Sequence, residues 1–576
     1  LAMDANPRRL DIRGGIDTNG YVLETENGSL YSTSNLSGDG VLRVVGPGFL
    51  SASSPTTSDI FNEFSGKMEA SGGEIHLNFS GLNSTMTLCV DQQSDRVEFG
   101  GASPYTIGAI EGEGAIELSE HSRVIFGNGN ANGVFSGSLE SNNRITKIGT
   151  GRQDLVGTND LTDTSIVISE GTLGLTDSAV GGASKVEVYS LGRFLVLEDL
   201  SVPIIEGPGT VEIPSHTSLK IGETDESFTF LGHLESPFGS HGIIKRGTGF
   251  AVFRASNTSD FAGSLVISDG EVRFFGGSIL PATYGISIGT NGTLAGYGEI
   301  TRPFTNRGRI LADWSSGPMR IGGYQDLRNY GTIGTESGGT IELDGLYLQQ
   351  YPVGSYPAGR LEANGRAIRL VGDNPTTVHG GTIETIGTGK IELVGSAITL
   401  REVDHSGHLS LRSGVDVTAE DFDIVTGAEH TLNVEFEPDT DESDGAIRGH
   451  GTATLGGTLQ VTLPDGYEPA AGDSMTVIDG DDTGVWSIDE SFGSIELPDI
   501  SPLLMRVVSN PDSLTVVVSC DADLAAPFGA LNFLDVSAFL DLYGSGDLSV
   551  DLAAPFGTLN FLDVSAYLTA FGNGCP

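Results

Sequence analysis

Cysteine, tryptophan and basic side chains are scarce in this chain, and long apolar runs are missing. Its 576 residues include three cysteines, two tryptophans and 30 Lys and Arg residues, against 76 Asp and Glu residues. No apolar run approaches the roughly 20 residues of a membrane-spanning helix, so we expect no membrane span. The net charge of −46 repels phosphate backbones, and nucleic acid is therefore not an expected partner.

Glycine, by contrast, is abundant and recurs in a fixed context. Many of the 83 glycines precede one small or polar residue and then an aliphatic residue that opens an alternating strand. Examples are Gly114-Ala115-Ile116, Gly171-Thr172-Leu173, Gly270-Glu271-Val272, Gly331-Thr332-Ile333 and Gly407-His408-Leu409. Such a strand cannot bury its apolar face alone, whereas stacked coils can, so the pattern predicts a mainly β fold built as a parallel solenoid. At roughly 20 to 25 residues per coil, residues 20–430 would hold about 16 to 20 coils.

A longer repeat refines this prediction. The segment ITKIGTGRQDLVGTNDLTDTSIVISEGTLGL begins at Ile145, and IIKRGTGFAVFRASNTSDFAGSLVISDGEVRFF begins at Ile243. These segments, within 105–180 and 240–340, resemble the autotransporter-associated β-strand repeat, a family of right-handed β-helix segments in large bacterial surface proteins. The resemblance implies a right-handed parallel β-helix in a protein that is secreted or displayed on a bacterial cell surface. The start, LAMDANPRRL, shows no signal peptide, so we expect the mature form.

The pattern breaks at EPDTDESDGA, residues 437–446, and short strands with Gly, Pro and Asp turns follow. The last coil of a solenoid exposes an unpaired edge and an open core, which a terminal cap must cover. We therefore expect the β-helix over 1–445 and a β-rich capping module or small β-sandwich over 446–519.

The C-terminal segment is duplicated. DLAAPFGALNFLDVSAFL begins at Asp523 and recurs as DLAAPFGTLNFLDVSAYL at Asp551. Each copy places a Pro-Gly loop before an apolar helical run that an Asn can cap, over Asn532–Tyr543 and Asn560–Phe571. The duplication and the closing Gly-Asn-Gly-Cys-Pro resemble the GC-type dockerin domain of exported bacterial proteins, which implies a docking module over 520–576. The expected docking surface comprises Phe528, Phe533, Phe539, Phe556, Phe561 and Tyr567.

The three cysteines divide into a pair and a single residue. Cys520 and Cys575 bracket the C-terminal module, which favours a disulfide that closes it. Such a closure stabilises by about 4 kcal/mol in the chain-entropy account. Cys89, in the alternating run TMTLCV, is interpreted as a small strand residue, because no recognisable His partner activates it. His405 and His408 straddle a Gly corner without the further ligands that zinc requires.

Dockerins of the ordinary kind bind Ca²⁺ in an EF-hand-like loop, and the spacing here can be compared with that loop. The candidate ligands are Asp523, Asn532 and Asp535 in the first copy, and Asp551, Asn560 and Asp563 in the second. Loop positions 1, 3 and 5 would be Leu524, Ala526 and Phe528, which carry no side-chain oxygen. The alternative is that Asn532 and Asp535 cap a helix while Phe528 and Phe556 fill a small core. Both interpretations remain open.

Two functions are compatible with these features. The first is a non-catalytic extracellular structural or adhesive protein, anchored or assembled through its C-terminal module. Its partner would be a surface anchor or another copy of the chain, the latter giving a head-to-tail filament, with contact to polysaccharide as a further option. The second is a β-helix polysaccharide lyase or hydrolase, which needs paired acids on an exposed sheet. No carboxylate cluster stands beside aromatic sugar platforms, and Trp314 and Trp486 are far apart, so the first function is expected.

Overall fold

The protein is described by a computed structural model. It describes residues 9–575, apart from 13–15, 27–28, 33–35, 53–62, 79–81, 102–103, 181, 237–240, 255–260, 279–284, 324–325, 337, 373, 396, 413–414, 416, 421–422, 426–429, 437, 439–446, 481–485 and 489–491.

The described chain is mainly β and forms a parallel β-solenoid of about 16 turns. This confirms the predicted solenoid. The chain divides into two compact units, Leu1–Gly298 and Glu299–Pro576. The α-helices are α1 (Asp177–Val180), α2 (Phe533–Ser545) and α3 (Phe561–Asn573).

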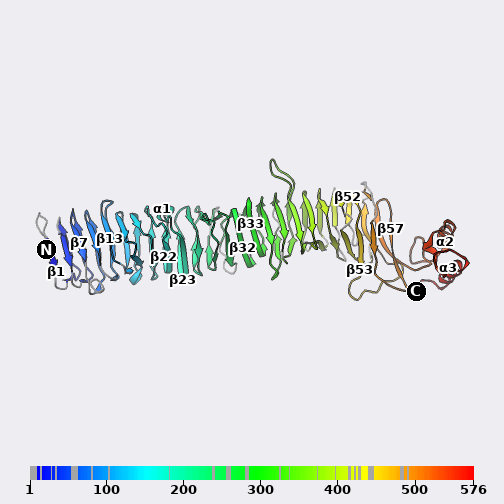
Figure 1. Ribbon diagram of the computed structural model, residues 1–576, viewed down its shortest axis with the longest axis horizontal. Helices are drawn as coiled ribbons and strands as arrows, with labels where there is room; N and C mark the ends of the chain where they lie inside the picture. Colours follow the sequence, from blue (N-terminus) through cyan, green and yellow to red (C-terminus); the bar gives the residue numbers. More distant parts are fainter. Residues whose placement is uncertain are drawn as a thin grey trace. The chain divides into compact units, whose positions relative to one another are not determined.

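In the first unit, strands of successive coils pair in parallel and in register, as the arrows beside β7 and β13 show (Figure 1). One sheet consists of β1 (Arg9–Ile12), β4 (Ser29–Ser32), β7 (Phe49–Ala52), β10 (Glu74–Leu77), β13 (Arg96–Phe99), β16 (Ala115–Leu118) and β19 (Ser138–Glu140). The register places Ile75 between Leu50 and Val97, and all three side chains are buried. The aliphatic residues of the alternating pattern therefore form a continuous internal stack, which is the hydrophobic reason for the fold.

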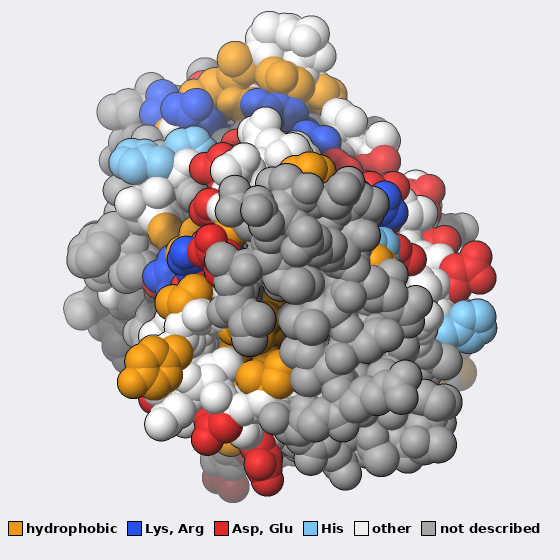
Figure 2. All heavy atoms as spheres, turned by 90° about the vertical axis from the view of Figure 1, so that its left-hand side faces the viewer, with side chains coloured by type: hydrophobic (Ala, Val, Ile, Leu, Met, Phe, Trp, Pro, Cys, Tyr) orange, Lys and Arg blue, Asp and Glu red, His pale blue; other side chains and the backbone are white. Residues whose placement is uncertain are grey.

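A second face of the first unit carries rows of charge. It begins with β3 (Val22–Glu26), β6 (Val41–Val45), β9 (Lys67–Ser71), β12 (Thr87–Val90) and β15 (Ala109–Gly112). Arg43 pairs in register with Glu24 and Glu69, and its guanidinium lies 3.5 Å and 3.0 Å from their carboxylates. Basic and acidic side chains likewise stand next to each other on the flanks visible in Figure 2. Ion pairs between coils therefore reduce the repulsion between acidic side chains of neighbouring coils.

The long repeat detected in the sequence is also a repeat in the structure. Lys147 ends β20 (Arg144–Lys147) and Lys245 ends β30 (Ile243–Lys245), and both side chains are fully buried. The Nζ of Lys147 donates to the carbonyls of Ile148 and Gly149 at 2.6 Å and 2.7 Å. Lys245 does the same to the carbonyls of the two residues that follow it, at 2.6 Å and 2.7 Å. In both copies, a lysine ammonium inside the coil holds the Gly-Thr-Gly corner.

The second unit has an internal ladder of amides. Asn306, at the end of β34 (Phe304–Asn306), donates from Nδ2 to Oδ1 of Asn329, at the end of β37 (Asp326–Asn329), over 2.8 Å. Asn329 donates in turn to Oε1 of Gln350 over 2.7 Å. All three side chains are fully buried, so each amide satisfies the next, as polar groups inside a protein require.

The pairing of strands crosses the expected boundary at residue 445. Parallel pairing continues from β49 (Val417–Glu420) to β52 (Ile447–Thr454), and from β51 (Thr431–Glu435) to β53 (Thr458–Thr462). The parallel ladder therefore does not end before the acidic segment. Residues 439–446 themselves lie outside the described residues.

The ladder ends in antiparallel strands, which we call the closing sheet. It consists of β54 (Ser474–Gly480), β58 (Ser513–Ser519) and β57 (Leu504–Ser509), with β58 antiparallel to both of the others. Because β54 also pairs in parallel with β52, the closing sheet continues the solenoid directly instead of forming a separate sandwich. This end of the ladder leads into the C-terminal helices.

Candidate docking site

The two C-terminal helices begin with the same capping arrangement. Oδ1 of Asn532 accepts a hydrogen bond from Leu534 N at 2.7 Å, and Oδ1 of Asn560 accepts one from Leu562 N at 2.8 Å. The Asp three residues after each Asn accepts from the backbone N–H of that Asn, which completes a capping box at both helices. This confirms the capping role that the sequence left open.

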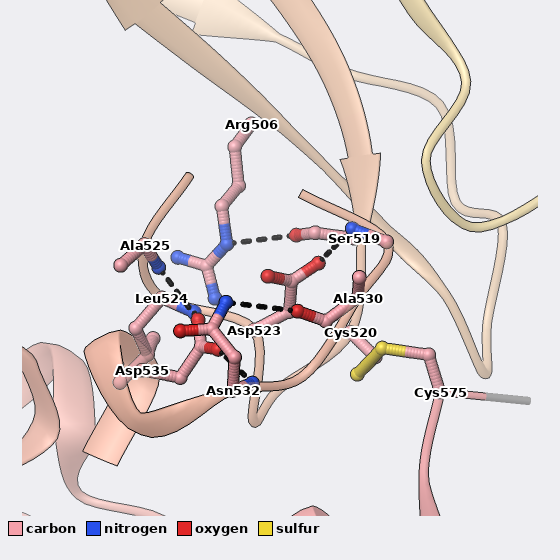
Figure 3. Close-up of a disulfide and its surroundings, with 11 residues drawn as sticks. Arg506, Ser519, Cys520, Asp523, Leu524, Ala525, Ala530, Asn532, Asp535 and Cys575 are labelled. Atoms are coloured by element: carbon pink, nitrogen blue, oxygen red, sulfur yellow. Dashed lines mark hydrogen bonds between the residues drawn. A yellow bond between two sulfur atoms is a disulfide. The ribbon is translucent and has the colours of Figure 1, made fainter. Parts of the chain in front are cut away.

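The aspartates also hold the loops before the helices. Asp535 is fully buried, and its Oδ1 accepts from Leu524 N at 2.9 Å and Ala525 N at 2.8 Å. Its Oδ2 accepts from Asn532 N at 2.7 Å, and Oδ2 of Asp523 accepts from Gly529 N at 2.6 Å (Figure 3). Burial raises the pKa of Asp523, and the neighbouring carboxylate of Asp535 adds to this rise. Two carboxyl groups therefore close the first loop by accepting backbone amides.

The second copy repeats this chemistry. Asp563 is fully buried, and its carboxylate accepts from Ala553 N at 2.8 Å and Asn560 N at 2.7 Å. Oδ2 of Asp551 accepts from Gly557 N. The near-identical sequences thus give near-identical loop-helix units.

The side-chain oxygens of the six candidate Ca²⁺ ligands accept backbone amides of the two loops and helix starts. Calcium takes six to eight oxygens, usually from several carboxylates and carbonyls. In both copies the carboxylates at the helix starts already accept backbone amides. Among the described residues, only Oδ1 of Asp523 and Oδ1 of Asp551 are buried carboxylate oxygens of this module without a hydrogen-bond partner. No group of three or more His, Cys, Asp or Glu side chains in the described part of the chain is placed to hold a metal.

A disulfide and an aromatic stack form the centre of the module. Cys520 and Cys575 are joined in a disulfide (Figure 3). The rings of Phe539 and Tyr567 stack with their centroids 4.0 Å apart. Burial, with the charges of Asp535 and Asp523, raises the pKa of Tyr567 to about 12. The small core also takes in partly buried side chains such as Leu503, which precedes β57.

Two residues of the expected docking surface are buried, and the alternative that Phe556 fills a small core is wrong. Phe539 and Tyr567 are buried and cannot dock a partner, because a module of this size has only the facing sides of its two helices from which to build a core. Phe556 is 73 % exposed and fills no core. Phe528 is half-buried.

The exposed apolar side chains occupy equivalent positions of the two copies. Phe533 and Phe561, the first residues of α2 and α3, are 79 % and 78 % exposed. Sequence analysis missed four further exposed leucines at equivalent positions, Leu534, Leu540, Leu562 and Leu568, and Leu548, which has no equivalent. Leucines lie one and seven residues after the first Phe of each helix. This spacing recurs in both copies of the sequence and could have identified them.

On the solenoid, many carboxylates are engaged by arginines of neighbouring coils. Arg193 lies 2.7 Å from Glu212 and 2.5 Å from Glu235. A hollow of about 550 Å³ on the same unit is lined by Glu111, Asn132, Gly133, Val134, Arg152 and Asp154. Within it Arg152 binds Asp154 through two nitrogens, one at 2.7 Å. Asp154 therefore serves as an ion-pair partner in this hollow.

The other residues noted in the sequence are structural. Cys89 is a buried free thiol in β12, and burial raises its pKa although Lys67 acts in the opposite direction. His405 is buried, and burial together with His430 and His408 lowers its pKa to about 4. The rings of His408 and His430 lie 5.4 Å apart. Among the described residues, these histidines belong to no group of side chains that could hold a metal ion.

Comparison with known proteins adds no relative. No protein-family model matches the sequence, and a search of curated proteins finds no significant match. Among the described residues, no helix is long and apolar enough to cross a membrane.

Proposed function

We propose that this chain is a non-catalytic extracellular protein of structural or adhesive function, carried by a bacterium and docked to a partner through its C-terminal module. The observation that carries the proposal is the exposure of Phe533 and Phe561, with Leu534 and Leu562 beside them, at equivalent points of two helices. The resemblance to a dockerin and to surface β-helix repeats supports the same function.

The solenoid suits a scaffold in this proposal. Its interior is filled by stacked aliphatic side chains, and its flanks carry ion pairs between successive coils, such as Arg369 with Glu342 and Glu392. A surface of this kind remains soluble because of its charge, and contact with polysaccharide through its polar flanks is part of the adhesive alternative.

The test compares the double variant Phe533→Ser/Phe561→Ser with the control Val134→Ser/Leu191→Ser, which removes two exposed apolar side chains of the solenoid. Binding of the purified full chain to envelope fragments of the producing bacterium, and its self-association, are measured by co-sedimentation and negative-stain microscopy. We expect the first variant to keep its circular dichroism spectrum and to bind at least about tenfold more weakly. The control should bind like the wild type.

Retained binding by Phe533→Ser/Phe561→Ser would contradict docking through these helices. Turnover of a polysaccharide that a single carboxylate substitution abolishes would overturn the non-catalytic assignment and favour the lyase or hydrolase alternative.

A further inference from the structure

The two loops of the C-terminal module have nearly the same sequence but different surroundings. The first loop, Asp523–Asn532, and the second loop, Asp551–Asn560, differ only in Ala530 against Thr558. A Cβ added at Gly529 would lie 2.4 Å from the Cα of Gly472, whereas one added at Gly557 would have nothing within 4 Å. The first loop is therefore pressed against the rest of the chain, and the second loop is open at the corresponding glycine.

The surface that receives the first loop is the closing sheet and the turn before it. A hollow of about 340 Å³ has Ala526, Pro527 and Phe528 of the loop on one side. Its other lining residues are Gly472, Ser474, Val508, Thr515 and Val517 of the closing sheet and its leading turn. The surface thus offers a glycine for close approach, two valines and two hydroxyls.

An arginine completes this contact. Arg506 extends from β57 toward the first loop (Figure 3), and its Nε donates to Oγ of Ser519 at 2.9 Å. Its positive charge interacts with the carboxylates of Asp521 and Asp523. The first loop is therefore bound by shape at Gly529 and by charge at Asp523.

The second loop presents the same groups without these contacts. Phe556 is 73 % exposed while its equivalent Phe528 is half-buried. Oδ1 of Asp551, like Oδ1 of Asp523, is buried and has no hydrogen-bond partner among the described residues, so the two loops differ at the Phe and the Gly. Gly557 keeps the positive φ of Gly529, at 89° against 87°, so the open loop already has the conformation of the bound one.

We infer that the second loop is a docking site for a partner protein whose surface repeats the chemistry of the closing sheet, with a glycine opposite Gly557, valines facing Phe556 and an arginine reaching Asp551. The inference rests on the proposed docking function and names the partner's surface. A second copy of this chain is the weaker candidate, since its closing sheet is held by its own first loop at the high effective concentration of an intramolecular contact.

The chain itself supplies the probe. In Gly529→Asn the new side chain meets backbone atoms at and beside Gly472, which should expel the first loop and leave the closing sheet free to bind another chain's second loop. Gly557→Asn is the matched control, because it imposes the same positive φ, which Asn tolerates, and meets nothing. Phe528→Ala vacates the same surface without a steric clash.

Sedimentation velocity and fluorescence titration of full-length chains then measure association. We expect Gly529→Asn and Phe528→Ala to bind wild-type chains, and Gly557→Asn alone to remain like the wild type. Introducing Gly557→Asn or Phe556→Ala into both chains of the mixture should weaken association at least about tenfold.

The inference is overturned if both vacated variants fail to bind wild-type chains, or if they bind equally well after Phe556 is removed from both chains. Binding of the envelope partner separates this result from the broader proposal. Loss with Phe533→Ser/Phe561→Ser but not with Gly557→Asn would leave docking through the helices intact and eliminate docking through the second loop.

Discussion

Replacing Lys147 with Met tests whether a buried ammonium holds the corner of a coil. Methionine has nearly the same length and shape, so the substitution leaves no cavity of consequence. It removes the donors to the carbonyls of Ile148 at 2.6 Å, Gly149 at 2.7 Å and Glu170 at 3.3 Å. The change therefore isolates the hydrogen bonds from the packing.

The size of the effect follows from two opposing contributions. Charge-assisted hydrogen bonds contribute about 1.5 kcal/mol or more each, so three of them set a gross loss of about 4 to 5 kcal/mol. Removing a charge from the interior recovers part of this loss. We expect a net decrease of about 2 kcal/mol in the free energy of unfolding near pH 7. Lys245→Met should have an effect of the same sign but a smaller one, because Lys245 donates to two carbonyls of its corner, at 2.6 Å and 2.7 Å.

The pH dependence has a definite sign. Burial lowers the pKa of Lys147 from 10.5 to about 8, although Glu170 acts in the opposite direction. Between pH 8 and 10.5 the unfolded chain therefore binds more protons at this lysine than the folded chain does. The wild type should gain stability as pH rises through this window, and Lys147→Met should lack that gain. The difference between the two proteins thus increases toward pH 10.

Urea denaturation at pH 7, 8, 9 and 10, with hydrogen exchange of residues 144–175 as a local readout, measures these effects. Lys220→Met is the control, since Lys220 lies half-buried on an outward position of β27 (Leu219–Ile221). A Lys147→Met protein that matches Lys220→Met at every pH would refute the assigned role of the ammonium.

Three other outcomes follow from the structure. Excess EDTA should leave the thermal unfolding of the C-terminal module unchanged, and a downward shift that Ca²⁺ restores would contradict the loop assignment. Cys520→Ser should destabilise this module by about 4 kcal/mol, seen as faster proteolysis within 521–575, whereas Cys89→Ser should not accelerate that cleavage. The buried His405 has a pKa of about 4, below its unfolded value, so its contribution is present above about pH 6.5 and is lost as pH falls toward 4. Acid denaturation of His405→Leu should show a shallower loss over that range, and an unchanged acid limb would contradict the assignment.

The alternation of inward and outward residues along each strand made much of the solenoid predictable from the sequence. The sequence pattern predicted that the aliphatic residues of each strand point inward. The register confirms this for Leu50, Ile75 and Val97. The same alternation puts Lys147 on the buried side with Ile145, although a lysine is rarely fully buried. Three backbone carbonyls make burial of this charge acceptable, and sequence alone does not reveal where carbonyls converge.

The helical module was less predictable because α2 and α3 are apolar around most of their circumference. Their sequences, FLDVSAFLDLYGS and FLDVSAYLTAFGN, offer two aromatic residues as core candidates near each helix start. The neighbouring helix and the disulfide decide between them, and they place Phe539 against Tyr567 while Phe533 and Phe561 face outward. The choice depends on tertiary contacts between the two helices, so the periodicity of each helix sequence could not decide it.

The exposed second loop is the feature that the fold itself does not require. Asp551 and Asp563 position the helix through backbone amides, and that task needs neither a Phe at 556 nor open space beside Gly557. An exposed phenylalanine adds a tendency to aggregate without stabilising the monomer. The same residue in the first loop lines the contact with the closing sheet. The second loop repeats these groups, yet no described residue of its own chain lies against Gly557. Docking onto a second surface like the closing sheet would bury what the isolated chain leaves exposed.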